Sequence, residues 1–246
     1  MGRLRDRSTK VTTLREPVPG VLMFERTWGS NVYIIPGDAT TLIDAGFPLD
    51  ERRIVKALNG NQLGLMVATH YHIDHVGPMS RLKERFGGEV AAHSADAGVM
   101  EGTIPYRLYK LDPLRTVYYK VLSPLYQYEF VQVDRWLEDG NILDVLGGLE
   151  VIHLPGHTEG SIALYQPERG ILFSGDTIRN EKRILEGPPP NFSIGIKEAF
   201  RHIRDKVLER DFDVLLPGHG EPVTSGARQG VERLVRDYEA LGSPSP

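Results

Sequence analysis

The sequence contains no cysteine among its 246 residues. This absence excludes disulfide bonds, thiolate metal ligands and a cysteine nucleophile. Long apolar runs are also missing, so no segment has the length of a membrane span. The basic start, MGRLRDRSTK, has no apolar stretch of the kind found in secretory signal peptides. We therefore expect a cytoplasmic protein that does not bind membranes.

A strong charge of either sign is lacking as well. The formal net charge at pH 7 is -4, and no basic stripe is present that would follow a phosphate backbone. We therefore expect a small-molecule substrate rather than a nucleic acid. The content of 40% hydrophobic and 25% charged residues is that of a globular protein with a substantial core. The oligomeric state stays open, and a homodimer is compatible with the sequence.

Predicted strands and helices alternate in both halves of the chain. Short apolar runs bounded by Gly or Pro predict strands at residues 21–26, 31–35, 40–46, 63–70, 89–94, 149–156, 162–167, 170–176 and 212–220. Apolar residues at helical spacing predict helices at residues 50–60, 78–88, 196–211 and 226–242. Two sheets, each covered by helices on its outer face, form one layered α/β arrangement that satisfies this pattern.

A Tyr-rich segment, residues 101–140, interrupts the alternation. Asp112 is a candidate N-cap, Pro113 stands at the first helical position, and Leu114, Tyr118 and Val121 share one side. We interpret the segment as a helical insertion between two strand-rich halves. Two roles remain open for it: plain helical packing with half-buried tyrosines, or a lid over a substrate pocket.

Histidines are concentrated in THYHIDHVG, residues 69–77, directly after a predicted strand. His70 and His72 are two residues apart, so in an extended chain their side chains point the same way. Asp74 and His75 follow where the loop turns into a helix. Neutral imidazoles and carboxylates are ligands that Zn²⁺, Fe²⁺ and Mn²⁺ accept. The spacing suggests two pairs of ligands and therefore two metal ions.

Three more candidate ligands follow predicted strands further along the chain. LPGHTEGS contains His157, LFSGDT contains Asp176, and LLPGHGE contains His219. Loops after buried strands are where rigid scaffolds commonly present ligands. The lone histidines His93, His153 and His202 favour structural roles instead.

These four motifs, in this order, resemble those of the metallo-β-lactamase-fold hydrolase superfamily over residues 20–225. The resemblance implies a four-layer αβ/βα sandwich formed by one domain, residues 1–246, with the helical insertion at about 101–140. It implies that His70, His72 and His157 hold one metal ion and that Asp74, His75 and His219 hold another. Asp176 would bridge the two ions.

The carboxylate at position 176 makes the chain similar to glyoxalase II and its relatives. The resemblance also implies that Asp44 supports the metal loop, with plain turn chemistry as the alternative for this residue, and that Thr158 and Ser161 support the loop of His157. However, TIRNEKRILEGPPP, which follows Asp176, lacks the basic, Gly-rich segment with which glyoxalase II grips glutathione.

The expected activity is that of a binuclear metallohydrolase with two divalent ions, zinc first, with iron and manganese as alternatives. A metal-bridging hydroxide would attack a small ester, thioester or lactone, and Asp74 would be the catalytic residue that orients it and passes on its proton. Tyr71 and the tyrosines of 106–128 are candidate substrate contacts. Alternative functions are a phosphodiesterase or nuclease, a mono-iron persulfide dioxygenase, and a metal-bound scaffold without turnover.

Overall fold

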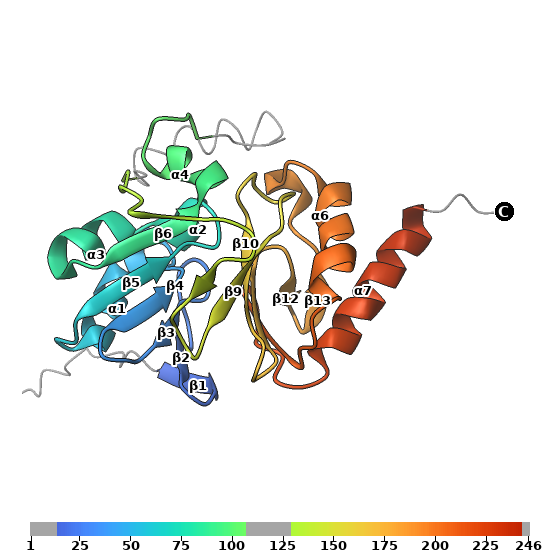
Figure 1. Cartoon of the computed structure of the whole chain (residues 1–246), viewed down its shortest axis with the longest axis horizontal. Coiled ribbons are helices and arrows are strands. Elements are labelled where there is room, and N and C mark those ends of the chain that lie inside the picture. Colours follow the sequence, from blue (N-terminus) through green and yellow to red (C-terminus); the bar gives the residue numbers. More distant parts are fainter. Residues whose placement is uncertain (1–13, 107–128, 243–246) are drawn as a thin grey trace, which may run out of the picture.

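The computed structural model describes residues 14–106 and 129–242. In these residues two β-sheets face each other, and helices cover the outer face of each sheet (Figure 1). This confirms the predicted four-layer αβ/βα sandwich. The start of the helix predicted at Asp112 lies within residues 107–128, outside the described residues, as do all the tyrosines of that segment except Tyr106.

The first sheet has seven strands in the order in which they occur along the chain. Neighbours from β1 to β4 are antiparallel, whereas β4 to β7 run parallel to one another. The strands are β1 (Leu14–Val18), β2 (Val21–Phe24), β3 (Tyr33–Ile35), β4 (Thr40–Ile43), β5 (Leu63–Val67), β6 (Glu89–His93) and β7 (Arg135–Leu137). Strands β1 and β7 were not predicted. Because β7 pairs with β6, the interval assigned to the helical insertion is not helical throughout.

The second sheet has five strands in the order β14-β11-β10-β9-β8. Only β11 and β14 are parallel. The strands are β8 (Ile142–Leu143), β9 (Leu149–His153), β10 (Ile162–Gln166), β11 (Ile171–Gly175) and β14 (Val214–Pro217). A separate hairpin is formed by β12 (Arg179–Glu181) and β13 (Ile184–Glu186).

Helices flank the sheets and join their strands. The α-helices are α1 (Glu51–Leu58), α2 (Ile73–Val76), α3 (Met79–Phe86), α4 (Ser94–Met100), α6 (Ile196–His202) and α7 (Ala227–Gly242). Helix α1 is preceded by a 3₁₀ turn, Pro48–Asp50, and another such turn spans Pro190–Phe192. Helix α6 continues as a π-helical turn, Ile203–Val207, so the helix predicted for 196–211 changes its hydrogen bonding midway. No helix in the described part of the chain combines the length and apolar character needed to cross a bilayer.

Three apolar clusters hold the four layers together. The central cluster lies between the sheets, and the outer two lie between each sheet and its helices. Alternation along β3 shows how one strand serves two layers: Tyr33 and Ile35 belong to the central cluster, and Ile34 belongs to an outer one. The rings of Tyr33 and Phe173 meet edge to face across the sheets at 5.3 Å. The packed sheets thus fix the strand ends from which the candidate ligands project.

Candidate metal centre

Each predicted ligand follows the end of a strand. His70 and His72 come directly after β5, and the short helix α2 behind them carries Asp74 and His75. The loops after β9, β11 and β14 carry the other three: His157, Asp176 and His219. A rigid sandwich can therefore hold side chains from four separate segments in one place.

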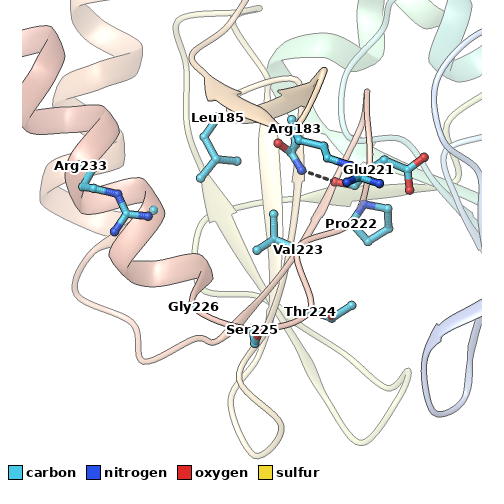
Figure 2. Close-up of a pocket in the computed structure, with 11 residues that line it drawn as sticks. Arg183, Leu185, Glu221, Pro222, Val223, Thr224, Ser225, Gly226 and Arg233 are labelled. Carbon is cyan, nitrogen blue, oxygen red and sulfur yellow. Dashed lines mark hydrogen bonds between the residues drawn. The ribbon is translucent and has the colours of Figure 1, made fainter.

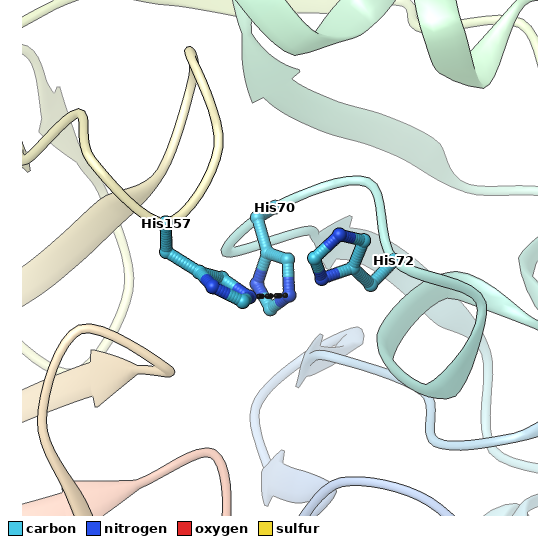
Figure 3. A group of neighbouring side chains, drawn as sticks. All are labelled: His70, His72 and His157. Carbon is cyan, nitrogen blue, oxygen red and sulfur yellow. Dashed lines mark hydrogen bonds between the residues drawn. The ribbon is translucent and has the colours of Figure 1, made fainter. Parts of the chain in front are cut away.

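All seven side chains converge. Their ligand atoms form three overlapping groups, and within each group the atoms lie within 4.8 Å of one another. The first trio is His70, His72 and His157 (Figure 3). The second trio is Asp74, His75 and His219. The third group, His70, His75 and Asp176, connects the two trios.

Asp176 lies between the trios. Its Oδ2 is 3.7 Å from His157 Nε2, and its Oδ1 is 3.3 Å from His75 Nε2 and 3.5 Å from His219 Nε2. Oδ1 is buried and accepts no hydrogen bond from the described residues. A buried carboxylate oxygen without a donor is costly unless a cation neutralises it.

Hydrogen bonds on the outer side of the rings set the imidazole tautomers. The Thr69 hydroxyl donates its only proton to Asp44 Oδ2. The same hydroxyl lies 3.1 Å from His70 Nδ1 and must therefore accept a hydrogen bond from this nitrogen. The Ser193 hydroxyl donates to the Pro189 carbonyl and in the same way accepts from His157 Nδ1 at 2.9 Å. In both rings Nε2 is left with a lone pair facing the cluster.

His75 is oriented in the same way, by a hydrogen bond on the outer side of its ring. Its Nδ1 lies 2.7 Å from Asp44 Oδ2, so the proton on this nitrogen is donated outward. Asp44 thus contacts both Thr69 and His75, which confirms its predicted support of the metal loop. The hydrogen bonds of Thr158 with Ser161 likewise confirm their support of the His157 loop: Thr158 N donates to Ser161 Oγ at 2.9 Å.

The geometry fits divalent cations. Tetrahedral Zn²⁺ has metal–nitrogen distances of about 2.0–2.1 Å, which places neighbouring ligand atoms about 3.3 Å apart. The Nε2 atoms of His70 and His157 are 3.1 Å apart, and those of His75 and His219 are 3.3 Å apart. Asp74 Oδ2 lies 3.2 Å from His219 Nε2. His70 and His157 both present lone pairs, which repel at such a distance unless a cation lies between them.

Electrostatics make the first trio neutral and the carboxylates negative. Burial lowers the pKa of His70 and His157 well below the usual range and that of His72 to about 4, so these rings are neutral. Burial would raise the pKa of Asp176, but nearby His219 and His75 outweigh it and hold this pKa well below its ordinary value. Partial burial would raise the pKa of Asp74, but neighbouring His219 and His75 outweigh it and lower this pKa as well. Burial would lower the pKa of His75 and His219, but Asp44 raises that of His75 and Asp176 raises that of His219, so a cation at the second trio displaces protons.

Two supporting residues were missed from the sequence. The Asp96 carboxylate is fully buried and accepts hydrogen bonds from Tyr71 N, Thr158 Oγ1 and Gly160 N. The Asn31 amide donates to the carbonyls of Pro217 and Gly220, on either side of the His219 loop. Their partners are mostly backbone groups, which leave no motif in the sequence.

Other candidates lie outside the cluster. Tyr71 is only 1% exposed and packs in the core, so its side chain cannot reach a substrate in this structure, and the prediction that it contacts one is corrected. Tyr106 is half-buried, and its ring lies 6.1 Å from that of His72. None of the described groups of potential ligands includes the remaining histidines, His93, His153 and His202.

A separate cavity of about 500 Å³ opens between the β12–β13 hairpin and the start of α7 (Figure 2). Its lining includes Arg183, Leu185, Val223 and Arg233 but none of the seven converging side chains. Asn180, which lines this cavity, donates its backbone N–H to the His219 carbonyl.

A sequence profile of the metallo-β-lactamase superfamily matches residues 26–219, which include all seven converging residues. The chain belongs to the metallo-β-lactamase superfamily. This membership, together with the ligand geometry, makes the converging residues a candidate site for metal-dependent hydrolysis.

Proteins similar in sequence to this chain include a probable metallo-hydrolase, an acyl-coenzyme A thioesterase and a hydroxyacylglutathione hydrolase. The probable metallo-hydrolase YflN of Bacillus subtilis is 31% identical over 79% of this chain and 82% of its own length. The acyl-coenzyme A thioesterase MBLAC2 of Gallus gallus is 31% identical over 84% of this chain and 76% of its own. The hydroxyacylglutathione hydrolase GloC of Haemophilus influenzae is 28% identical over 75% of this chain and 82% of its own. These relatives are consistent with the predicted glyoxalase II-like branch.

Solved structures in the superfamily share the fold. The metallo-β-lactamase family protein TTHA1429 of Thermus thermophilus superposes with a TM-score of 0.69, covering 91% of this chain and 80% of its own, at 20% identity. BJP-1, a subclass B3 metallo-β-lactamase of Bradyrhizobium japonicum, gives 0.66 over 93% of this chain and 92% of its own, also at 20% identity. At such identities the likeness concerns the fold alone.

Proposed function

We propose that this chain is a binuclear metallohydrolase of thioesters, and that small esters and lactones are its next-best substrates. The observation on which this depends is the meeting of seven nitrogen and oxygen ligands with the spacing of two tetrahedral sites. The thioesterase and hydroxyacylglutathione hydrolase relatives support thioesters as the substrate class.

The first trio would hold one cation, the second trio another, and Asp176 would contact both. Such a pair of ions, most simply zinc, lowers the pKa of water and polarises a carbonyl oxygen. The chain supplies a ligand set that is neutral at the first trio and carries negative charge at Asp74 and Asp176.

Asp74 is the proposed catalytic residue. Its side chain is 36% exposed, whereas that of Asp176 is 6% exposed, so Asp74 faces the side from which substrate arrives. A carboxylate there can orient the attacking water through a hydrogen bond and take up its proton. Tyr106, beside His72, would form part of the substrate wall.

We do not expect the chain to recognise glutathione as the carrier of the acyl group. After Asp176 the chain forms the β12–β13 hairpin, in which Arg179 is paired with Glu181 and Glu186. A paired arginine is a weak handle for an anionic peptide. An acyl thioester with another carrier is therefore the favoured substrate.

The test combines metal analysis with a substrate panel. Protein purified without added metal is expected to contain two divalent ions per chain and to hydrolyse an acyl-coenzyme A faster than a lactone, a phosphodiester or a β-lactam. One iron per chain with sulfite formed from a persulfide would instead establish the dioxygenase alternative. Faster cleavage of a phosphodiester would establish the nuclease alternative.

A further inference from the structure

The geometry points to Asp96 as the positioning residue of the first trio. This role depends on the proposed metal centre. Asp96 itself would contact neither the metal nor the substrate. The Asp96 carboxylate ties the backbone between His70 and His72 to the loop of His157, so that three imidazoles from two distant segments stay in register.

The hydrogen bonds show this connection directly. Asp96 Oδ2 accepts from Tyr71 N at 3.1 Å, and Tyr71 is the residue between the two histidines of the first segment. The same oxygen accepts from Thr158 Oγ1 at 2.7 Å, and Oδ1 accepts from Gly160 N at 2.6 Å. One carboxylate thus bridges two segments that are far apart in the sequence.

The fit around the carboxylate is close. A Cβ atom added at Gly160 would lie 2.6 Å from Asp96 Cγ, so only glycine allows the loop to approach the carboxylate this closely. Asp96 itself stands in the first turn of α4, which packs on β6 and keeps the side chain from moving away.

Burial of the Asp96 carboxyl group destabilises the folded state. Asp96 has no exposed surface, and no Lys, Arg or His among the described residues forms an ion pair with it. Burial raises the pKa of Asp96 to about 7, although the three donors act in the opposite direction. Whenever this carboxyl group is charged, it is buried without a cationic partner among the described residues and costs stability, so we infer that the compensating benefit lies in the geometry that it imposes.

The second trio depends on other residues. His75 is held by Asp44, and the His219 loop is held by Asn31 and by Tyr33, whose hydroxyl donates to the Pro217 carbonyl at 2.8 Å. Loss of the Asp96 carboxylate should therefore weaken cation binding at the first trio and leave the second nearly unchanged.

Single-site backgrounds separate the two trios. His219→Ala leaves the first trio intact, and His157→Ala leaves the second. Cobalt(II) affinity of the metal-stripped proteins is measured by visible absorption in competition with a chelator. In the His219→Ala background, Asp96→Asn is expected to weaken binding by about 10- to 100-fold, the usual effect of removing a group that orients a ligand. In the His157→Ala background, we expect less than a twofold change.

Two further variants act as controls. Thr158→Val keeps the side-chain shape and removes one of the three donors, so a smaller loss, of about three- to tenfold, is expected at the first trio. Asp50→Asn alters another fully buried carboxylate, which accepts from Trp28 N and Phe47 N but contacts neither segment of the first trio. It should lower the melting temperature without weakening cobalt binding at the first trio.

Four results would overturn the positioning role of Asp96. Equal weakening in the two backgrounds, or weakening by Asp50→Asn as large as by Asp96→Asn, would overturn the positioning role. If Asp96→Asn does not fold, unchanged binding by Thr158→Val has the same consequence. If neither single-site background binds cobalt while Asp96 is intact, the metal centre itself is refuted, and the positioning role is refuted with it.

Discussion

The two trios of the candidate metal centre differ in their exposure. The first trio is buried, with His70 at 1%, His72 at 7% and His157 at 1% exposure. In the second trio the side chains of Asp74 and His219 are 36% and 25% exposed, and only His75 is fully covered. A buried site holds its ligands rigidly, whereas a partly exposed site can admit water and substrate. We therefore assign anchoring mainly to the first trio and proton handling to the second.

The largest effect is expected from His72→Ala. This change removes one of the three histidines of the buried trio, so the protein should lose that cation and hydrolysis should fall by about 10³-fold or more, the equivalent of several kcal/mol. Elemental analysis and thioesterase assays check this. Full activity with undiminished metal content would show that the ligand assignment is wrong.

Asp74→Asn should separate binding from catalysis. The amide keeps an oxygen ligand but loses the charge and the proton acceptor, so much of the metal should stay while kcat falls by about 10²- to 10⁴-fold. The measurement is kcat for thioester hydrolysis beside metal content. A normal kcat would exclude the proton-handling role and remove the functional contrast between the trios.

Asn31→Ala tests the support of the open trio. The amide donates at 2.9 Å and 2.8 Å to the carbonyls on either side of the His219 loop, so its loss should free that loop. We expect about tenfold weaker cobalt binding in the His157→Ala background and little change in the His219→Ala background. The reverse pattern would contradict the division of support between the two trios.

The last prediction concerns the stability of the metal-free protein as a function of pH. The pKa of Asp96 is raised to about 7 in the folded state, from an ordinary value of 3.8. Its contribution to stability is therefore fully present below pH 3.8 and is lost as the pH rises through about 7. Urea unfolding with a chelator present should show the wild type losing stability relative to Asp96→Asn across this window, by at most about 1.4 kcal/mol per pH unit. A pH-independent difference would show that Asp96 stays charged throughout.

Much of the fold could be predicted because hydrophobic periodicity is a local signal. The strands from β2 to β6 and the helices α1, α3 and α7 are found where the pattern placed them. The edge strands β1 and β7 were not predicted because β1 (LREPV) is polar and only partly buried and β7 has three residues, so neither shows an apolar alternation. Tyr71 was misjudged because its neighbours are ligands, while its own side chain turns into the core.

By itself, the sequence determined which side chains offer ligand atoms, since histidine and aspartate spacing after buried strands is a property of residue identity. It also determined the layered α/β class through the alternation of periodic segments. Only the tertiary structure decided that Asp96 and Asn31 support these ligands, because their partners are largely backbone N–H and C=O groups, which every sequence contains and which only folding brings within reach.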